Sequence, residues 1–232
     1  MAFGVLKSVL PNRPVPMRIW RGPLRGGRAV MNPRHSLRKV LGLYEHELNQ
    51  WLESALRLTN RVIDVGSNDG YFTFGCAAAY RRAQKRSEII AFEPDAEHFR
   101  SLSDSLRSQP NAFVEFSLIQ SFVGASDNAA SKTLDSVQGN RQNTLIKIDV
   151  EGAEEAVLAG ATSWLQKTNY FLIEVHKPGF LETIPLLFAG HGLILDQINQ
   201  RPLKLLGREV RDEQNWWLVS RLPSLSEERR KP

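Results

Sequence analysis

Cysteine is nearly missing from this sequence, since Cys76 is the only one among 232 residues. A lone cysteine can form no internal disulfide, so a reducing cytoplasm is the expected location. Cys76 falls within the helical pattern YFTFGCAAAYRRA. That setting favours a buried, inert thiol over a nucleophile.

Long apolar runs are missing as well. No stretch approaches the ~20 residues that a membrane-spanning helix requires. The N-terminal run FGVLKSVL is interrupted by Lys7 and stopped by Pro11. The sequence therefore predicts neither a secretory signal nor a transmembrane segment. An organellar transit peptide is disfavoured because Pro14, Pro16 and Pro23 would break its amphipathic helix.

Acidic residues are missing from residues 1–40, whereas the whole chain has a formal charge of only +5. A basic arm of this kind is typical of segments that bind nucleic acids or anionic membranes. No nucleic-acid-binding motif accompanies the charge, so we interpret the arm as a solvated, partly flexible extension. An alternative is that the arm closes over an anionic substrate. Its basic residues are Lys7, Arg13, Arg18, Arg21, Arg25, Arg28, Arg34, Arg38 and Lys39.

The length of 232 residues suits one substantial α/β core. The hydrophobic content of 42% and charged content of 24% are ordinary for a globular protein. We divide the chain into a basic N-terminal extension (1–40), one α/β domain (41–222) and a polar C-terminal tail (223–232).

Strands and helices alternate after an amphipathic helix predicted over residues 41–58. Residues 124–143 are polar and rich in turn formers. Strands are predicted at 61–65, 88–93, 113–122, 144–149 and 170–175, and helices at 71–82, 95–107, 156–165 and near 179–190.

The C-terminal part has a different pattern. The apolar runs LILDQIN and NWWLVSR are joined by a polar bridge that holds Pro202 and Gly207. Two such runs without an intervening helix predict an antiparallel hairpin that closes one side of the sheet. This architecture differs from a dinucleotide-binding fold with six parallel strands.

Acidic residues stand where four apolar runs end. A strand buried on both faces reads as a continuous apolar run, so these acids mark strand ends. The corresponding edge of an open α/β sheet is the ligand crevice. The sequence thus predicts an acid-lined cleft for a cationic or hydroxyl-rich small molecule. The acids are Asp64, Glu93, Asp149, Glu151 and Glu174.

The loop DVGSNDG follows the first of these strands and opens a helix. Gly66 allows a tight turn, Gly70 allows close helix approach, and Asn68 tolerates a left-handed backbone. The glycine spacing departs from G-x-G-x-x-G, and Asp64 stands where a pyrophosphate would be repelled.

S-adenosylmethionine fits this loop better than a nicotinamide cofactor, because it carries an ammonium, a sulfonium and a ribose diol but no phosphate. Asp64 is predicted to hold the methionine end, directly or through a water. Glu93 is predicted to accept both ribose hydroxyls. The alternative for each acid is a helix N-cap or a solvated carboxylate.

At these residues the chain resembles the FkbM family of S-adenosylmethionine-dependent methyltransferases, over roughly residues 20–176. The string IKIDVEGAE is the most distinctive piece of the resemblance. Other matching pieces are RGPLRGGR, LGLYEHEL, VIDVGSNDGYFT, AFEPDAEHFRSL, TLD at 133–135 and FLIEVH.

The resemblance implies a class I methyltransferase fold: a Rossmann-like three-layer α/β sandwich whose seven-stranded, mostly parallel sheet ends in an antiparallel strand. It also implies S-adenosyl-L-methionine as cofactor and methyl transfer to a hydroxyl of a sugar, glycolipid or polyketide-like acceptor. Ser126 or Asp127 is our prediction for the adenine contact, although this region departs from the family pattern. The cofactor residues would be Asp64, Gly66, Ser67, Asn68, Gly70, Glu93, Ser126 and Asp127.

Asp149 and Glu151, two residues apart, would point the same way if strand geometry persists, as would Glu174 and His176. These four residues are predicted to frame the acceptor pocket, with Asp149 and Glu151 the first candidates for positioner or base. His176 has the side chain with an ordinary pKa nearest neutrality, but a structural role is as common. Glu151 could instead serve a helix N-terminus.

Carboxylates at 149 and 151 would suit magnesium or calcium, but clustered acids do not establish a site, and no metal is predicted. Two other function classes stay open. One is a nicotinamide-dependent oxidoreductase, and the other is a non-catalytic, nucleic-acid-binding relative that uses the basic arm. The expected partner is a small-molecule or glycan hydroxyl acceptor, with nucleic acid disfavoured and the oligomeric state undetermined.

Overall fold

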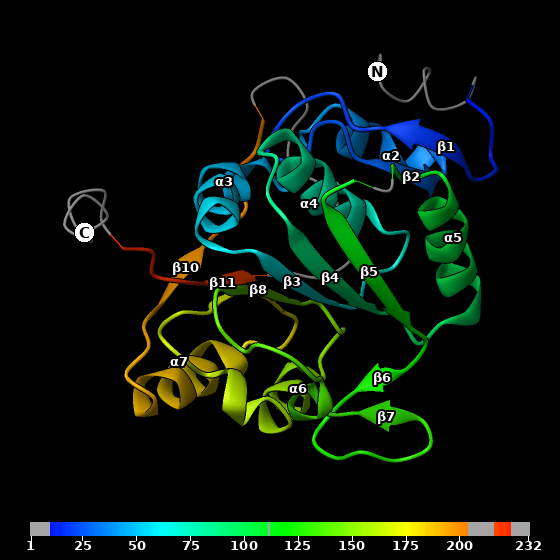
Figure 1. Cartoon of the computed structure of the whole chain (residues 1–232). Coiled ribbons are helices and arrows are strands. Elements are labelled where there is room, and N and C mark those ends of the chain that lie inside the picture. The colour runs from blue at the N-terminus through cyan, green and yellow to red at the C-terminus, as the bar shows by residue number, and fades with distance from the viewer. Residues whose placement is uncertain (1–9, 111, 204–215, 224–232) are drawn as a thin grey trace.

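The computed structural model describes residues 10–110, 112–203 and 216–223. Its centre is a seven-stranded sheet of order β10-β11-β9-β8-β3-β4-β5 (Figure 1). Neighbouring strands pair in parallel except at β11, which is antiparallel to both β9 and β10. The predicted sheet and its antiparallel last strand are confirmed. The strands are β3 (Arg61–Val65), β4 (Ser87–Phe92), β5 (Val114–Ile119), β8 (Thr144–Ile148), β9 (Tyr170–Val175), β10 (Leu195–Ile198) and β11 (Trp216–Ser220).

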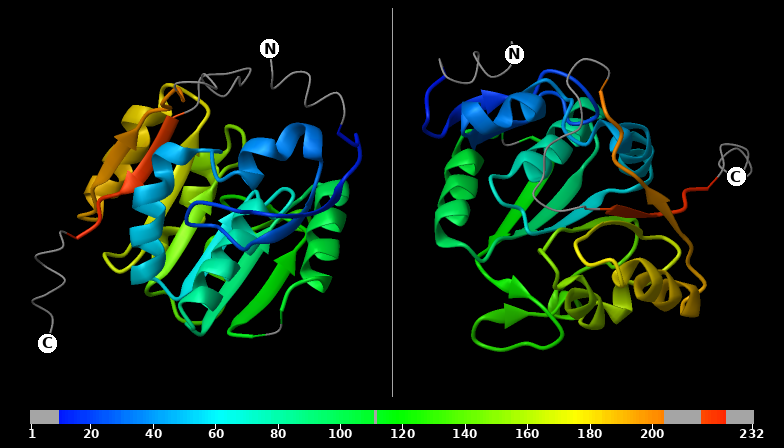
Figure 2. Two further views of the ribbon diagram at one scale, coloured as in Figure 1. Left: turned by 90° about the horizontal axis from the view of Figure 1, so that it is seen from above. Right: turned by 180° about the vertical axis from the view of Figure 1, so that it is seen from behind.

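Helices cover both faces of the sheet and make the predicted three-layer sandwich (Figures 1 and 2). No helix in the described part of the chain is long and apolar enough to cross a membrane. One face carries α3 (Asn49–Leu58), α4 (Tyr71–Arg82) and α5 (Ala96–Arg107), and the other carries α6 (Glu154–Ala159), the 3-10 turn η3 (Thr162–Trp164) and α7 (Phe180–Gly190).

Apolar clusters pack against both faces of the sheet. On the side of α6 and α7, Trp164 and Phe188 are fully buried against the strands. On the side of α3 and α4, Trp217 and Tyr80 fill the centre. Cys76 of α4 lies in this second core, where burial raises the pKa of its thiol well above its usual value. The expected inert thiol is therefore in place.

The helix predicted over 41–58 begins later than expected. It starts at Asn49, after a 3-10 turn η1 (His46–Leu48). Gly42 and Glu45 have positive φ angles of 67° and 49°, which no helix accommodates. A Cβ at Gly42 would lie 2.4 Å from the carbonyl oxygen of Arg21, so the chain must turn there.

The helix predicted over 156–165 is also interrupted. Gly160 separates α6 from η3 and packs so tightly that a Cβ there would lie 2.1 Å from the Gly124 carbonyl oxygen. The residue Gly124 directly follows a short strand. Most of the polar region 124–143 has no regular secondary structure, as predicted. The small elements of this region are β6 (Phe122–Val123), β7 (Ser131–Lys132) and η2 (Leu134–Ser136).

The N-terminal segment is not the solvated extension that its charge suggested. Residues 15–40 form a β-hairpin and a helix that lie over α4 and α5 (Figure 2). Ile19, Leu24 and Met31 are at most 4% exposed and join the cores. Lys7, the hairpin connection 204–215 and the tail from 224 onward lie outside the described residues. The elements are β1 (Val15–Arg18), β2 (Arg28–Met31) and α2 (Pro33–Val40).

Candidate active site

A cleft of about 930 Å³ opens at the carboxyl ends of β3, β4, β8 and β9. Its volume is in the range of small-molecule sites. None of the described residues that line it is a lysine or arginine. The acid-lined crevice predicted from the strand ends therefore exists. The acids in its wall are Glu93, Asp95, Asp149, Glu151 and Glu174, and the histidines are His98 and His176.

The loop after β3 forms one wall of the cleft through Gly66 and Asn68. Both have a left-handed backbone, with φ of 79° and 48°. A Cβ at Gly66 would lie 1.8 Å from the carbonyl oxygen of Asp149, so only glycine lets the ends of β3 and β8 approach this closely. Gly70 also has a positive φ, of 81°, and caps α4 against Phe74 without lining the cleft.

Glu93 is fixed at the end of β4 by two backbone donors. The amide of Asn68 donates to its Oε2 at 2.7 Å, and the amide of Asp95 donates to its Oε1 at 2.9 Å. The residue is only 5% exposed but lines the cleft. Its carboxylate is thus oriented by the backbone and keeps lone pairs for a ligand hydroxyl.

Asp64 does not line the cleft, although we predicted that it holds the cofactor. Its side chain is fully buried between β3 and α4, where the Thr73 hydroxyl donates to Oδ2 at 2.5 Å. Burial raises the pKa of Asp64 to about 6, against the opposing effects of Lys147 and Thr73. The adjacent Ser67 is also buried, with its hydroxyl donating to the Phe92 carbonyl at 3.3 Å.

The predicted adenine contacts lie outside the cleft wall. Asp127 accepts hydrogen bonds from the amide and the hydroxyl of Thr133, at 2.8 and 3.2 Å. These bonds hold the pKa of Asp127 below its usual value, and its neighbour Ser126 is exposed. The chain enters the wall earlier, at Ser121 to Val123, where Phe122 is 61% exposed. Phe122 is the last residue of the strand predicted over 113–122, but in the structure β5 ends at Ile119 and Phe122 begins β6.

All four predicted acceptor-side residues line the same cleft: Asp149, Glu151, Glu174 and His176. The strand geometry does not persist to Glu151, however, because β8 ends at Ile148 and Glu151 has a φ of 50°. The condition on which Asp149 and Glu151 were predicted to point the same way is therefore not met. The acids in the first turn of the following helix, α6, are Glu154 and Glu155.

Glu154 contributes to this site, and the sequence reasoning did not identify it. It begins α6, is fully buried, and accepts a hydrogen bond from the Gly152 amide at 2.9 Å. Its Oε1 also lies 2.6 Å from Nδ1 of His176. The glutamate thereby fixes the orientation of the imidazole ring.

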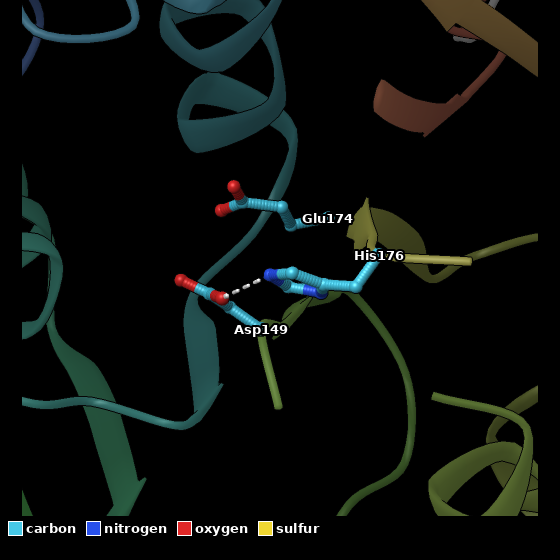
Figure 3. A group of neighbouring side chains, drawn as sticks. All are labelled: Asp149, Glu174 and His176. Carbon is cyan, nitrogen blue, oxygen red and sulfur yellow. Dashed lines mark ion pairs between the residues drawn. The ribbon is translucent and has the colours of Figure 1, made fainter. Parts of the chain in front are cut away.

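His176 turns its other nitrogen toward two carboxylates (Figure 3). Nε2 lies 3.8 Å from Oδ1 of Asp149, and Glu174 lies beside them. Burial opposes the charged imidazole, but the bond to Glu154 and the charges of Glu174 and Asp149 outweigh it. The pKa of His176 is raised as a result.

Lys147 is the second residue that the sequence reasoning missed. It is 6% exposed, and its Nζ lies 2.9 Å from Oδ2 of Asp149 and 3.8 Å from Oδ1 of Asp64. Burial disfavours the ammonium, yet the two aspartates outweigh that effect and raise the pKa of Lys147. A lysine inside the apolar run LIKID was the available signal. It links Asp64, behind the cleft, to Asp149 in its wall.

The known proteins that this chain resembles include methyltransferases. Residues 100–195 match the family model described as Methyltransferase FkbM domain. The chain is 26% identical over 137 residues to the hexuronic acid methyltransferase AglP of Haloferax volcanii. That match covers 49% of this chain and 54% of the relative, so the chain spans about half the length of the curated protein.

Solved structures agree on the fold. Methyltransferase FkbM from Methylobacillus flagellatus superposes with a TM-score of 0.58 at 16% identity, over 95% of this chain and 58% of that one. The putative methyltransferase yhhF from Escherichia coli gives a TM-score of 0.56 at 14% identity, over 89% and 98%. The class I methyltransferase fold implied by the resemblance is confirmed.

Proposed function

We propose that this chain, which carries a methyltransferase FkbM domain, transfers the methyl group of S-adenosyl-L-methionine to a hydroxyl oxygen of a sugar or glycan. One observation carries the proposal: a backbone-oriented Glu93 in a cleft whose described wall holds five acids and no lysine or arginine. Such a wall attracts a sulfonium cation and repels a pyrophosphate. The similarity to AglP, which is named as a hexuronic acid methyltransferase, supports a sugar acceptor.

The cofactor half of the cleft consists of the loop after β3, the end of β4 and the start of β6. Glu93 would accept the ribose hydroxyls, and the close approach at Gly66 leaves room for the backbone to contact the ligand. Phe122 offers an exposed ring on which an adenine can stack. Asp64 supports this region from behind through Thr73 and Lys147.

The acceptor half consists of the ends of β8 and β9. The cofactor supplies an electrophilic methyl group on sulfur when bound. The acceptor oxygen forms a bond to that carbon, the sulfur–carbon bond breaks, and its electron pair stays on sulfur. Asp149 would position the acceptor hydroxyl, held in place by Lys147, and Glu151 or Asp149 would take its proton. Glu151 is exposed, so a proton on it can pass to solvent.

A nicotinamide-dependent oxidoreductase is the competing enzyme class, and the acid wall disfavours it. Calorimetry with S-adenosylmethionine, S-adenosylhomocysteine and NAD separates the two. We expect binding of both sulfur compounds and none of NAD. Binding of NAD alone would overturn the proposal.

The acceptor class has its own test. Incubation with radiolabelled S-adenosylmethionine and a panel of neutral sugars, uronic acids and polyketide hydroxyls should label a sugar. The product's stability to mild base then separates an ether from a methyl ester.

We place the reaction in the cytoplasm, on the grounds of the lone buried Cys76.

The non-catalytic, nucleic-acid-binding alternative rested on the basic arm. The described part of that arm contacts the rest of the fold: its Lys39 pairs with Asp69 at 2.8 Å, and the carbonyls of its Pro23 and Arg25 accept hydrogen bonds from Arg82 of α4. These contacts favour a structural role for the segment. Salt-sensitive RNA binding that is lost on deletion of residues 1–40 would favour the alternative.

A further inference from the structure

We propose that Asp149, Glu174 and His176 bind a divalent cation, of the manganese or magnesium type, that holds oxygen atoms of the acceptor. This inference rests on the proposed methyl transfer and adds to it a metal that the sequence did not predict. The three residues lie at the ends of the adjacent strands β8 and β9, and their side chains converge in the cleft wall (Figure 3).

The spacing of the ligand atoms suits a cation. One atom from each side chain lies within 4.8 Å of the others, and Nε2 of His176 is 3.8 Å from Oδ1 of Asp149. That last distance is too long for a hydrogen bond. Ligands ~2.1 Å from a common ion stand about 3 Å apart at neighbouring corners of an octahedron and about 4.2 Å apart at opposite ones. With these geometries, closing the cluster around an ion takes movements of roughly 0.6–0.8 Å between ligand atoms, within the reach of side-chain adjustments.

The imidazole of His176 is oriented by a carboxylate, as the imidazoles of metal-binding histidines usually are. Metal-binding histidines usually give their second ring nitrogen to a carboxylate, which fixes the tautomer and aims the first nitrogen. Glu154 does this from a fully buried position, with Oε1 2.6 Å from Nδ1. The other oxygen of Glu154 is buried and accepts no hydrogen bond from the described residues. This carboxylate thus serves the ring and faces no solvent.

The charge balance of the wall points the same way. The aspartate oxygen that faces His176 is not the one that contacts Lys147, so a cation and the lysine can occupy opposite sides of Asp149. Five acids face a cleft whose described wall has no lysine or arginine. Lys147 compensates part of that charge at Asp149, and a divalent cation beside a sulfonium ligand would compensate more of it.

A cation here would also explain how this acidic wall binds and activates an acidic acceptor. An acidic sugar such as a uronate would be repelled by this wall, but its carboxylate or adjacent hydroxyls can coordinate a metal. Coordination lowers the pKa of a bound hydroxyl. The hydroxyl proton passes to Glu151, the oxygen forms its bond to the methyl carbon, and the broken sulfur–carbon bond leaves its electron pair on sulfur.

To test this inference, the full chain is first treated with a chelator to remove metal ions and is then titrated with manganese(II) chloride. Electron paramagnetic resonance and calorimetry measure the binding. We expect one ion per chain, with affinity weakened at least 10-fold in Glu174→Gln and His176→Gln. Asp104→Asn, an acid 45% exposed on α5, is the matched control and should bind as wild type does. Thermal melting of each variant shows whether it is folded.

Absence of manganese binding up to about 10 mM, or equal binding by all variants, would overturn the inference. The same samples are titrated with S-adenosylhomocysteine. Binding of that compound without manganese binding removes the metal site and leaves the proposed function standing. Binding of manganese without it supports the metal site and removes the proposed function.

Discussion

Glu93 is the residue on which cofactor recognition depends most directly. We expect Glu93→Ala to weaken S-adenosylhomocysteine binding about 10-fold to 100-fold, because hydrogen bonds to a charged acceptor contribute roughly 1.5–3 kcal/mol. The change also frees the amides of Asn68 and Asp95, which Glu93 now holds. Calorimetry measures the affinity. Glu93→Gln is the control for shape, and equal affinity of wild type and Glu93→Ala would remove the ribose assignment.

Asp149 should affect turnover and leave cofactor affinity largely intact. If it positions or deprotonates the acceptor, Asp149→Ala lowers kcat about 100-fold to 10,000-fold. S-adenosylmethionine affinity should change by no more than a few-fold, because Glu93 lies at the end of a different strand. Single-turnover assays and calorimetry separate the two effects. Asp149→Asn is the control for the contact with Lys147, and a parallel loss of cofactor binding would argue against this assignment.

Asp64 gives a pH dependence of stability with a definite sign. Its pKa rises from 3.8 in the unfolded chain to about 6 in the fold, chiefly through burial. The folded state therefore holds the proton more tightly, and the stability that this proton contributes is lost as pH rises from about 4 to about 6. The difference is on the order of 3 kcal/mol.

The comparison for Asp64 is urea unfolding of wild type and Asp64→Asn at pH 4, 5, 6 and 7. The free energy of unfolding of wild type relative to the variant should fall across that window. A difference that stays constant, or rises with pH, would contradict the assigned direction.

At the scale of elements, the close approach of the residues that follow β3 and β8 is the tightest feature of the site. Gly66→Ala would place a Cβ 1.8 Å from the Asp149 carbonyl, at a φ of 79°, so the two strand ends must separate. We expect loss of S-adenosylhomocysteine binding and a lower melting temperature. Gly179→Ala is the matched control, since a Cβ there meets nothing within 4 Å. Similar behaviour of the two variants would show that this close approach is unimportant for binding.

Elements with a regular period were predictable, and irregular ones were not. The bounds of β3, α4 and β9 agree with their predicted ranges because buried strands are continuous apolar runs and α4 lies between Gly70 and the basic pair Arg81 and Arg82. The late start of α3 and the break at Gly160 depend on contacts with Arg21 and Gly124, which are remote in sequence. Local patterns carry no information about such contacts.

The same distinction applies to the site. Strand-end acids could be placed on one edge because parallel strands share that edge, and all but Asp64 line the cleft. Which way a side chain turns depends on packing, and that is why Asp64 lies behind the wall. The contribution of Lys147 and Glu154 required three dimensions, because each acts on a residue of the wall through a contact.

For the whole molecule, the distribution of charge along the sequence does not match the division into structural units. The formal charge is +5, and the basic N-terminal segment suggested a separate arm. Its described part instead buries Ile19, Leu24 and Met31 against the helices. Tyr44, which follows that segment, lines the cleft. The segment therefore belongs to the fold that shapes the site, while the acids gather at the sheet edge.

This separation of charge predicts how salt changes ligand choice. S-adenosylmethionine and S-adenosylhomocysteine differ by one methyl group and one positive charge, so their affinity ratio reports the field of the acid wall. Raising salt from 0.1 M to 1 M shortens the screening length from about 10 Å to about 3 Å. The ratio should then shift several-fold toward S-adenosylhomocysteine, as measured by calorimetry. Glu174→Gln should reduce this shift and Asp104→Asn, outside the cleft wall, should not. A ratio that is independent of salt would mean that the wall does not act through its charge.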